Sequence, residues 1–269
     1  MLSRYIESGG VRSVSVTVRG CRVAVLLREC RVGLWPAQHG NQFDAYVRAM
    51  MATTHALAGM ALASAVSVFA PEYAPVAVVA AGAGGAFPDL DTPGRHRRTL
   101  HFPVYYTLAA VGLLVVALVV PSTVTVALAA FVGSAALHSV TDVFGGGLEL
   151  RPWEGTSDRA VYDHYHGRWV RPRRWVRYDG SPGDVALATL LAILTLVFAP
   201  AGGSLAGGSV RATAFSGELV PTLVLALVGV SVVYGLVRKP LVVAGEWLVA
   251  RLPRSVLDRI PLGFVEELQ

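Results

Sequence analysis

The stretch VYYTLAAVGLLVVALVV, residues 104–120, carries no charged side chain and decides the class of this protein. Its length is close to the roughly 20 apolar residues that cross the hydrocarbon core of a bilayer. Charged residues make up only 15% of the 269-residue chain. Ordinary soluble domains carry about 25%. We therefore expect an integral membrane protein of the cell's inner, cytoplasmic membrane, and not a water-soluble fold.

Further apolar runs on both sides of this stretch predict an all-α, polytopic bundle of about six membrane helices. The expected helices cover 54–70, 75–87, 102–120, 122–143, 184–200 and 217–237. The first two are short and form either two thin spans or a hairpin that enters the membrane and returns. In both alternatives residue 87 lies on the same side of the membrane as residue 54, so the orientation of the later helices does not change. The glycines of AAGAGGAF (80–87) suit close helix contact.

The positions of the basic residues predict the orientation of this bundle. Arginines gather in the connections 88–101 and 144–182 and in the tail, whereas the turns near 72 and 121 have no basic residue. With six crossings, every basic connection lies on one side, which the positive-inside rule assigns to the cytoplasm. Both termini are then cytoplasmic.

We expect four regions in the chain. Residues 51–145 hold the first four helices, 146–183 form a basic, aromatic loop at the membrane interface, and 184–269 form the last two helices and an amphipathic interfacial tail. Residues 1–50 form an N-terminal extension that contains both cysteines, Cys21 and Cys30, and lacks the apolar core of a signal peptide. An alternative hypothesis is that translation starts at Met50 or Met51, which the intact mass of the natively expressed protein tests.

Ionisable residues collect at the helix ends that this topology places on the cytoplasmic side. His138 and Asp142 are four residues apart and therefore share a helix face. An imidazole and a carboxylate in this arrangement can chelate a metal, although a purely structural hydrogen bond between them is the open alternative. His138 also lies within an apolar run, where an ionisable side chain is costly.

The same layer contains further nitrogen and oxygen donors from three other segments. They are His55 at the start of the first helix, Asp89 and Asp91 in PDLD, and His96 and His101 in HRRTLH. Each motif alone is weak, but together they predict a site for one or two divalent metals. This donor set suits zinc, with manganese and iron as alternatives.

The series T-H-x-L-x-G, P-D-x-D, H-R-x-x-x-H and H-x-x-x-D over residues 51–145 resembles the YdjM-like family of membrane-bound metal-dependent hydrolases. The resemblance implies a metal-dependent activity and a start just before the T-H pair, and it adds Arg97 to the residues above. The order of the motifs is also similar, more loosely, to that of zinc-dependent phospholipases C. Those enzymes add a later His-x-x-x-Glu, for which DHYH (163–166) is the nearest substitute, with different spacing.

The leading hypothesis is therefore a membrane hydrolase whose metal-activated water attacks an ester or phosphoester, with a lipid headgroup as the expected substrate class. We expect Asp91 to act as a bridging ligand or general base, and Arg97 to stabilise developing negative charge. The loop 146–183 is expected to contact membrane lipids rather than nucleic acid. The open alternatives are a metal-binding transporter, a metal-responsive membrane protein, and a structural protein joined by His–Asp hydrogen bonds.

Overall fold

The computed structural model describes residues 12–18, 21–27, 52–66, 68–92, 95–198 and 214–252. The chain divides into two compact units, Met1–Gln38 and His39–Gln269. In the first unit, β1 (Arg12–Val18) and β2 (Cys21–Leu27) form an antiparallel pair. The alternating residues of SVSVTV have the two-residue period of a strand. Met50 and Met51, the proposed alternative starts, lie outside the described residues.

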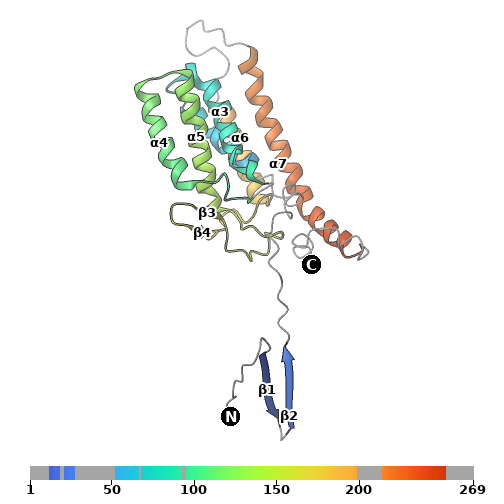
Figure 1. Cartoon of the computed structure of the whole chain (residues 1–269). Coiled ribbons are helices and arrows are strands. Elements are labelled where there is room, and N and C mark those ends of the chain that lie inside the picture. Colours follow the sequence, from blue (N-terminus) through green and yellow to red (C-terminus); the bar gives the residue numbers. More distant parts are fainter. Residues whose placement is uncertain are drawn as a thin grey trace. The chain divides into compact units, whose positions relative to one another are not determined.

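The second unit is mostly helical, which confirms the all-α expectation at this level (Figure 1). Its described α-helices are α2 (Ala52–Val66), α3 (Ala74–Ala86), α4 (Pro103–Val119), α5 (Thr123–Thr141), α6 (Pro182–Phe198) and α7 (Ala214–Val249). Short 3-10 turns are η1 (Pro71–Tyr73), η2 (Pro88–Asp91) and η3 (Asp142–Phe144). A small antiparallel pair, β3 (Val161–Asp163) and β4 (Arg168–Val170), lies between α5 and α6.

Local sequence explains where several helices begin. Pro103 starts α4, at a position where its missing N–H leaves no helical hydrogen bond unmade. Ser122 caps α5: its hydroxyl accepts from the backbone N–H of Thr125, and the Thr125 hydroxyl accepts from the N–H of Ser122. At the start of α6, the Ser181 hydroxyl accepts from the backbone N–H of Asp184.

The short helices α2 and α3 form the centre of the unit. Helix α2 packs against α3 and α6, α3 packs against α5, and α5 packs against α4. Buried Leu57 and Met60 of α2 meet Val78 of α3 and Val224 of α7 in one apolar core. Gly84 and Gly85 of α3 touch neighbouring backbone directly, which confirms that small residues allow close helix contact here.

Two described helices are long and apolar enough to cross a membrane, Thr123–Phe144 and Leu219–Val249. Helices α4 and α6 are shorter apolar helices of 17 residues each. Many large apolar side chains on α4, α6 and α7 face outward rather than into the core, including Leu118, Val197 and Leu236. This outer surface is typical of contact with lipid rather than with water.

One expectation about the second half of the chain is wrong. Helix α7 does not end near 237: it continues through Pro240 to Val249, so the first part of the expected interfacial tail belongs to the same helix. A proline within a helix is tolerated in apolar helices, where neighbouring groups satisfy the freed carbonyl. The loop 146–183 also contains the β3–β4 pair, which no helical pattern could have indicated.

Candidate metal centre

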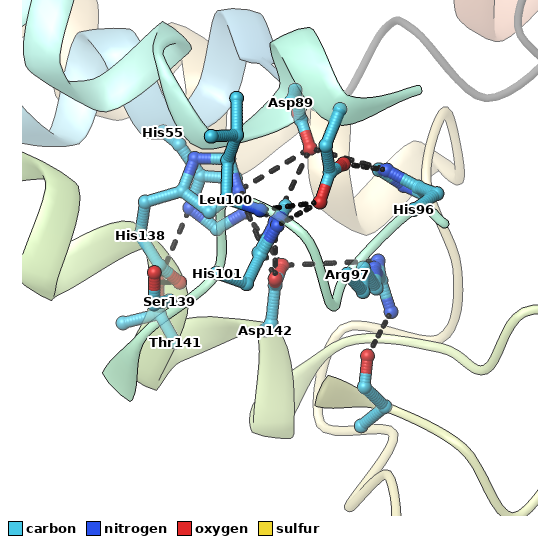
Figure 2. Close-up of polar contacts among 12 residues, drawn as sticks. His55, Asp89, His96, Arg97, Leu100, His101, His138, Ser139, Thr141 and Asp142 are labelled. Carbon is cyan, nitrogen blue, oxygen red and sulfur yellow. Dashed lines mark hydrogen bonds and ion pairs between the residues drawn. The ribbon is translucent and has the colours of Figure 1, made fainter. Parts of the chain in front are cut away.

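The chain brings the predicted residues together because successive helices alternate in direction. The first turn of α2, the turn η2 after α3, the segment before α4 and the end of α5 all lie at one end of the bundle (Figure 1). Figure 2 shows His55, Asp89, His101, His138 and Asp142 pointing toward one another from these four segments. All five are buried. The expected cluster is therefore present as a structural feature.

Among four donor atoms of this cluster, five of the six distances are close to those between neighbouring ligands of a tetrahedral metal site. His101 Nε2 lies 3.2 Å from His138 Nε2 and 3.2 Å from Asp142 Oδ2. Asp89 Oδ1 lies 3.5 Å from His101 Nε2 and 3.4 Å from His138 Nε2. His138 Nε2 lies 3.7 Å from Asp142 Oδ2. Metal–ligand bonds of about 2.0–2.1 Å in a tetrahedron separate neighbouring donors by about 3.3–3.4 Å, so Asp89, His101 and His138, which form one donor set, fit one ion.

A second, overlapping group of donors includes His55. Its Nε2 lies 3.3 Å from Asp142 Oδ1. The distances of the first group involve the other carboxylate oxygen, Oδ2. His55, His138 and Asp142 form one set of donors within 4.8 Å of one another, and Asp89, His101 and His138 form another. The Nε2 atom of His138 can bind only one ion. A second ion would therefore depend on Asp142 bridging the two positions.

Several of these donor atoms are buried without a hydrogen bond. Within the described part of the chain, His55 Nε2, Asp89 Oδ2 and both carboxylate oxygens of Asp142 have no hydrogen-bond partner. Burying an unsatisfied carboxylate is expensive, so a native fold keeps such a group when something binds it. A divalent cation at the centre would compensate the negative charge of both carboxylates. The residues therefore fit a metal ion.

Each of the three histidines is held through its other ring nitrogen. His138 Nδ1 donates to the carbonyl oxygen of Gly85, and His101 Nδ1 lies 3.0 Å from Asp91 Oδ2. His55 Nδ1 lies 3.1 Å from the hydroxyl of Thr141, which itself donates to the carbonyl of Leu137 and therefore accepts from the ring. A proton on Nδ1 leaves the lone pair on Nε2, which faces the centre. This pattern is typical of histidine ligands.

Asp91 lies behind His101 rather than among the converging donors. Its Oδ2 accepts from His101 Nδ1 and, at 3.0 Å, from the backbone N–H of Leu100. Its Oδ1 lies 2.9 Å from His96 Nδ1. Both oxygens are thus occupied, which favours a role in orienting His101 over the bridging or general-base role suggested by sequence. His96 likewise faces Asp91, and neither residue belongs to the two donor sets.

Electrostatics distinguish the groups outside the membrane helices. Burial alone raises the pKa of Asp91, but hydrogen bonds from His101 and His96 outweigh burial and lower it. Burial alone lowers the pKa of His101, but the carboxylates of Asp142, Asp89 and Asp91 beside its ring raise this pKa well above its ordinary value. A metal ion that binds Nε2 of His101 must therefore compete with a proton for this nitrogen.

Replacing Asp91 with asparagine is expected to weaken metal binding by about 10–100-fold without abolishing it, since a neutral amide orients His101 but no longer supports its charge. The measurement is metal competition between the purified protein and a chromophoric chelator. Asp163→Asn is the matched control, because Asp163 pairs with the half-exposed His166 and belongs to neither donor set. Loss of metal as complete as in a ligand variant would instead make Asp91 a direct ligand.

Arg97 joins the centre to the connection that follows α5. Its Nη1 donates to the carbonyl oxygens of Gly146 (2.8 Å) and Ala160 (3.3 Å), and its Nη2 lies 3.8 Å from Asp142 Oδ1. Its own carbonyl accepts from the backbone N–H of Tyr162. A positive φ of 56° at a non-glycine residue shows that the surrounding contacts determine this conformation. The geometry thus favours a role for Arg97 in holding the connection after α5 against the metal centre, in addition to the charge-stabilising role expected from sequence.

The DHYH segment contributes no donor to the centre. Asp163 pairs with His166 within the turn between β3 and β4, and His164 Nε2 donates to the carbonyl of Arg98. Sequence reasoning missed Thr141 and Gly85, which hold His55 and His138. No residue pattern marks a backbone carbonyl as a partner. It also missed Thr54, whose hydroxyl donates to Asp184 and fixes α2 to α6 beside His55.

Comparison with known proteins found no matching family model, no matching curated protein and no matching solved structure.

Proposed function

We propose that this chain is a membrane-embedded hydrolase that uses a divalent metal, zinc by the chemistry of its donors, to cleave an ester or phosphoester. The observation that supports it is the buried set of donor atoms from Asp89, His101 and His138, which lie 3.2–3.5 Å from one another. His101, His138 and Asp89 would hold the ion and leave a fourth position for water, with Asp142 and His55 beside it. A bound ion of this kind supplies a water whose pKa is lowered toward 7.

A six-helix membrane topology is part of this proposal. Helices α4–α7 carry the outward apolar side chains, whereas α2 and α3 are shorter and form the centre of the unit. The metal centre then lies at the depth of the headgroups, on the side of the arginine-rich connections 88–101 and 144–182. The positive-inside rule makes this side, and both termini, cytoplasmic.

The location of the centre supports a lipid headgroup as the substrate class. The connection after α5 exposes Tyr165 and Trp175, and Arg171 is also at the surface, which suits contact with lipid phosphates. The motif order of the YdjM-like membrane hydrolases supports the same reading by resemblance. A transporter is less favoured, since the ionisable side chains of the described α4, α5 and α6 lie near one end and not at mid-depth.

The full chain, purified in detergent and loaded with zinc, is expected to hydrolyse phospholipids or a generic phosphodiester such as bis-p-nitrophenyl phosphate. Chelator treatment should abolish the activity and zinc should restore it, because the attacking water is activated only on the ion. Asp89→Ala is expected to be inactive, and His166→Ala, outside the centre, to keep full activity. Inactivity of metal-replete protein on a broad panel of esters and phosphoesters would contradict the proposal.

A further inference from the structure

A small pocket lies beside the metal centre. Its lining includes His96 and Arg97, Glu149 and Asp179 from the connection after α5, and Arg238 of α7. Arg97 links the pocket to the centre, because its Nη2 lies 3.5 Å from Asp179 Oδ2 and 3.8 Å from Asp142 Oδ1. A molecule in the pocket is therefore separated from a metal ligand by a single guanidinium group.

The pocket contains negative acceptor atoms that the protein does not use. The Glu149 side chain is only 10% exposed, and its two carboxylate oxygens are buried without a hydrogen-bond partner among the described residues. Arg174 Nη2 comes no closer than 4.0 Å to Glu149, which is beyond hydrogen-bond distance. In the same described set, Asp179 Oδ1 is also without a partner.

The arginines beside these carboxylates already make other contacts. Arg97 donates from Nη1 to two backbone carbonyls, and Arg238 lies over the ring of Tyr234 at 5.3 Å. Three carboxylate oxygens of the pocket lining, two of Glu149 and one of Asp179, have no hydrogen-bond partner among the described residues, and neither has Arg174 Nε beside Glu149. Such a site favours a group that brings both positive charge and several donors.

We propose that this pocket binds a primary ammonium group, so that the substrate is a phosphoester whose head carries –NH₃⁺, as an ethanolamine phospholipid does. The inference rests on the proposed hydrolase function and specifies its substrate class. A primary ammonium offers three N–H donors to the three acceptor oxygens. A quaternary ammonium has no N–H donor, and a glycerol hydroxyl has no charge. Because Arg97 Nη2 lies within 3.8 Å of both Asp179 and Asp142, the two carboxylates are close enough for a short linker between phosphate and ammonium to span them.

The test measures lipid binding by native mass spectrometry, using the full chain in detergent after removal of metal with a chelator. Short-chain phosphatidylethanolamine is compared with phosphatidylcholine and phosphatidylglycerol. The wild-type chain is expected to bind the ethanolamine lipid about tenfold more tightly than the other two, because the charge-assisted hydrogen bonds are available only to it. Soluble phosphoethanolamine is added as a competitor. If it displaces the lipid, the headgroup alone is recognised. If it does not, the acyl chains also contribute to binding.

Glu149→Gln is expected to remove this preference, since it retains the size of the side chain but not its charge. Glu72→Gln is the matched control, because Glu72 is exposed in η1, at the opposite end of α3 from η2. Equal zinc binding by the variants shows that the fold is retained, and Asp179→Asn provides a second variant if Glu149→Gln does not fold.

Equal binding of the three lipids by wild type, or an unchanged preference in Glu149→Gln, would overturn the inference. Binding is measured without metal, so it does not depend on catalysis. A chain that hydrolyses phosphoesters with no headgroup preference would overturn this inference alone and leave the hydrolase proposal standing.

Discussion

Replacing His138 with alanine is expected to reduce bound metal from about one equivalent to background. The Nε2 atom of His138 lies within 3.2–3.7 Å of donors from His101, Asp89 and Asp142, and His138 belongs to both donor sets. Losing this ligand removes a metal bond and one donor from each of the two sets that contain Asp89 and Asp142. The affinity should therefore fall by more than the roughly 10–100-fold typical of losing a ligand's hydrogen-bond partner. Elemental analysis of protein purified without added metal provides the measurement.

His166→Ala is the matched control for this experiment. His166 is a half-exposed histidine that pairs with Asp163 in the β3–β4 turn and belongs to neither donor set. It should retain wild-type metal content, so a loss in His138→Ala alone locates the ion at the centre. Wild-type metal content in His138→Ala would contradict the assignment of ligands. A wild-type chain without metal would leave His–Asp contacts as a structural network.

The sequence was sufficient to predict the cluster because consecutive membrane helices run in opposite directions. The end of one helix and the start of the next therefore lie on the same side. Once His55, Asp89, His101 and His138 fall next to alternating ends of apolar helices, they must lie in one layer, whatever the detailed packing. Which of these residues faces a metal ion and which supports a ligand is seen only in the three-dimensional structure. Asp89 and Asp91 are equivalent by spacing, yet Asp89 faces the centre and Asp91 lies behind His101.

The connection between α5 and α6 shows where sequence patterns stop being informative. Its arginines and aromatic residues predicted contact with lipid, but several of them contact other side chains of the same chain. Arg151 donates to Glu246 of α7 at 2.6 Å, and Lys239 of α7 lies over the ring of Trp153. These pairs are distant in sequence and have no periodicity. The extension of α7 beyond 237 and the fold of this connection therefore depend on each other, which no local pattern could indicate.

Replacing Gly85 with alanine is expected to destabilise the helical unit by about 3 kcal/mol, at the upper end of the range for overpacking. A Cβ at this position would lie 2.5 Å from the carbonyl oxygen of His55 and 2.8 Å from Cα of Ala56. Both are backbone atoms of α2, so no side-chain rotation relieves the clash and the two helices must separate.

The same substitution is expected to weaken metal binding, because Gly85 connects to two ligands at once. Its position touches the backbone of His55, and its carbonyl accepts from Nδ1 of His138. Separation of α2 from α3 therefore moves one ligand and frees another. The measurements are the apparent melting temperature in detergent, expected to fall by roughly 5–10 °C, and zinc content of the purified variant.

Gly133→Ala in α5 distinguishes close packing from the general effect of replacing a helical glycine. A Cβ at Gly133 has no atom within 4 Å among the described residues, so alanine there should be neutral or stabilise the helix by about 0.5–1 kcal/mol. If Gly85→Ala matched Gly133→Ala in melting temperature and zinc content, the close approach of α2 and α3 beneath the metal centre would be refuted. A large loss in Gly85→Ala alone would show that helix packing and ligand geometry are set by the same contact.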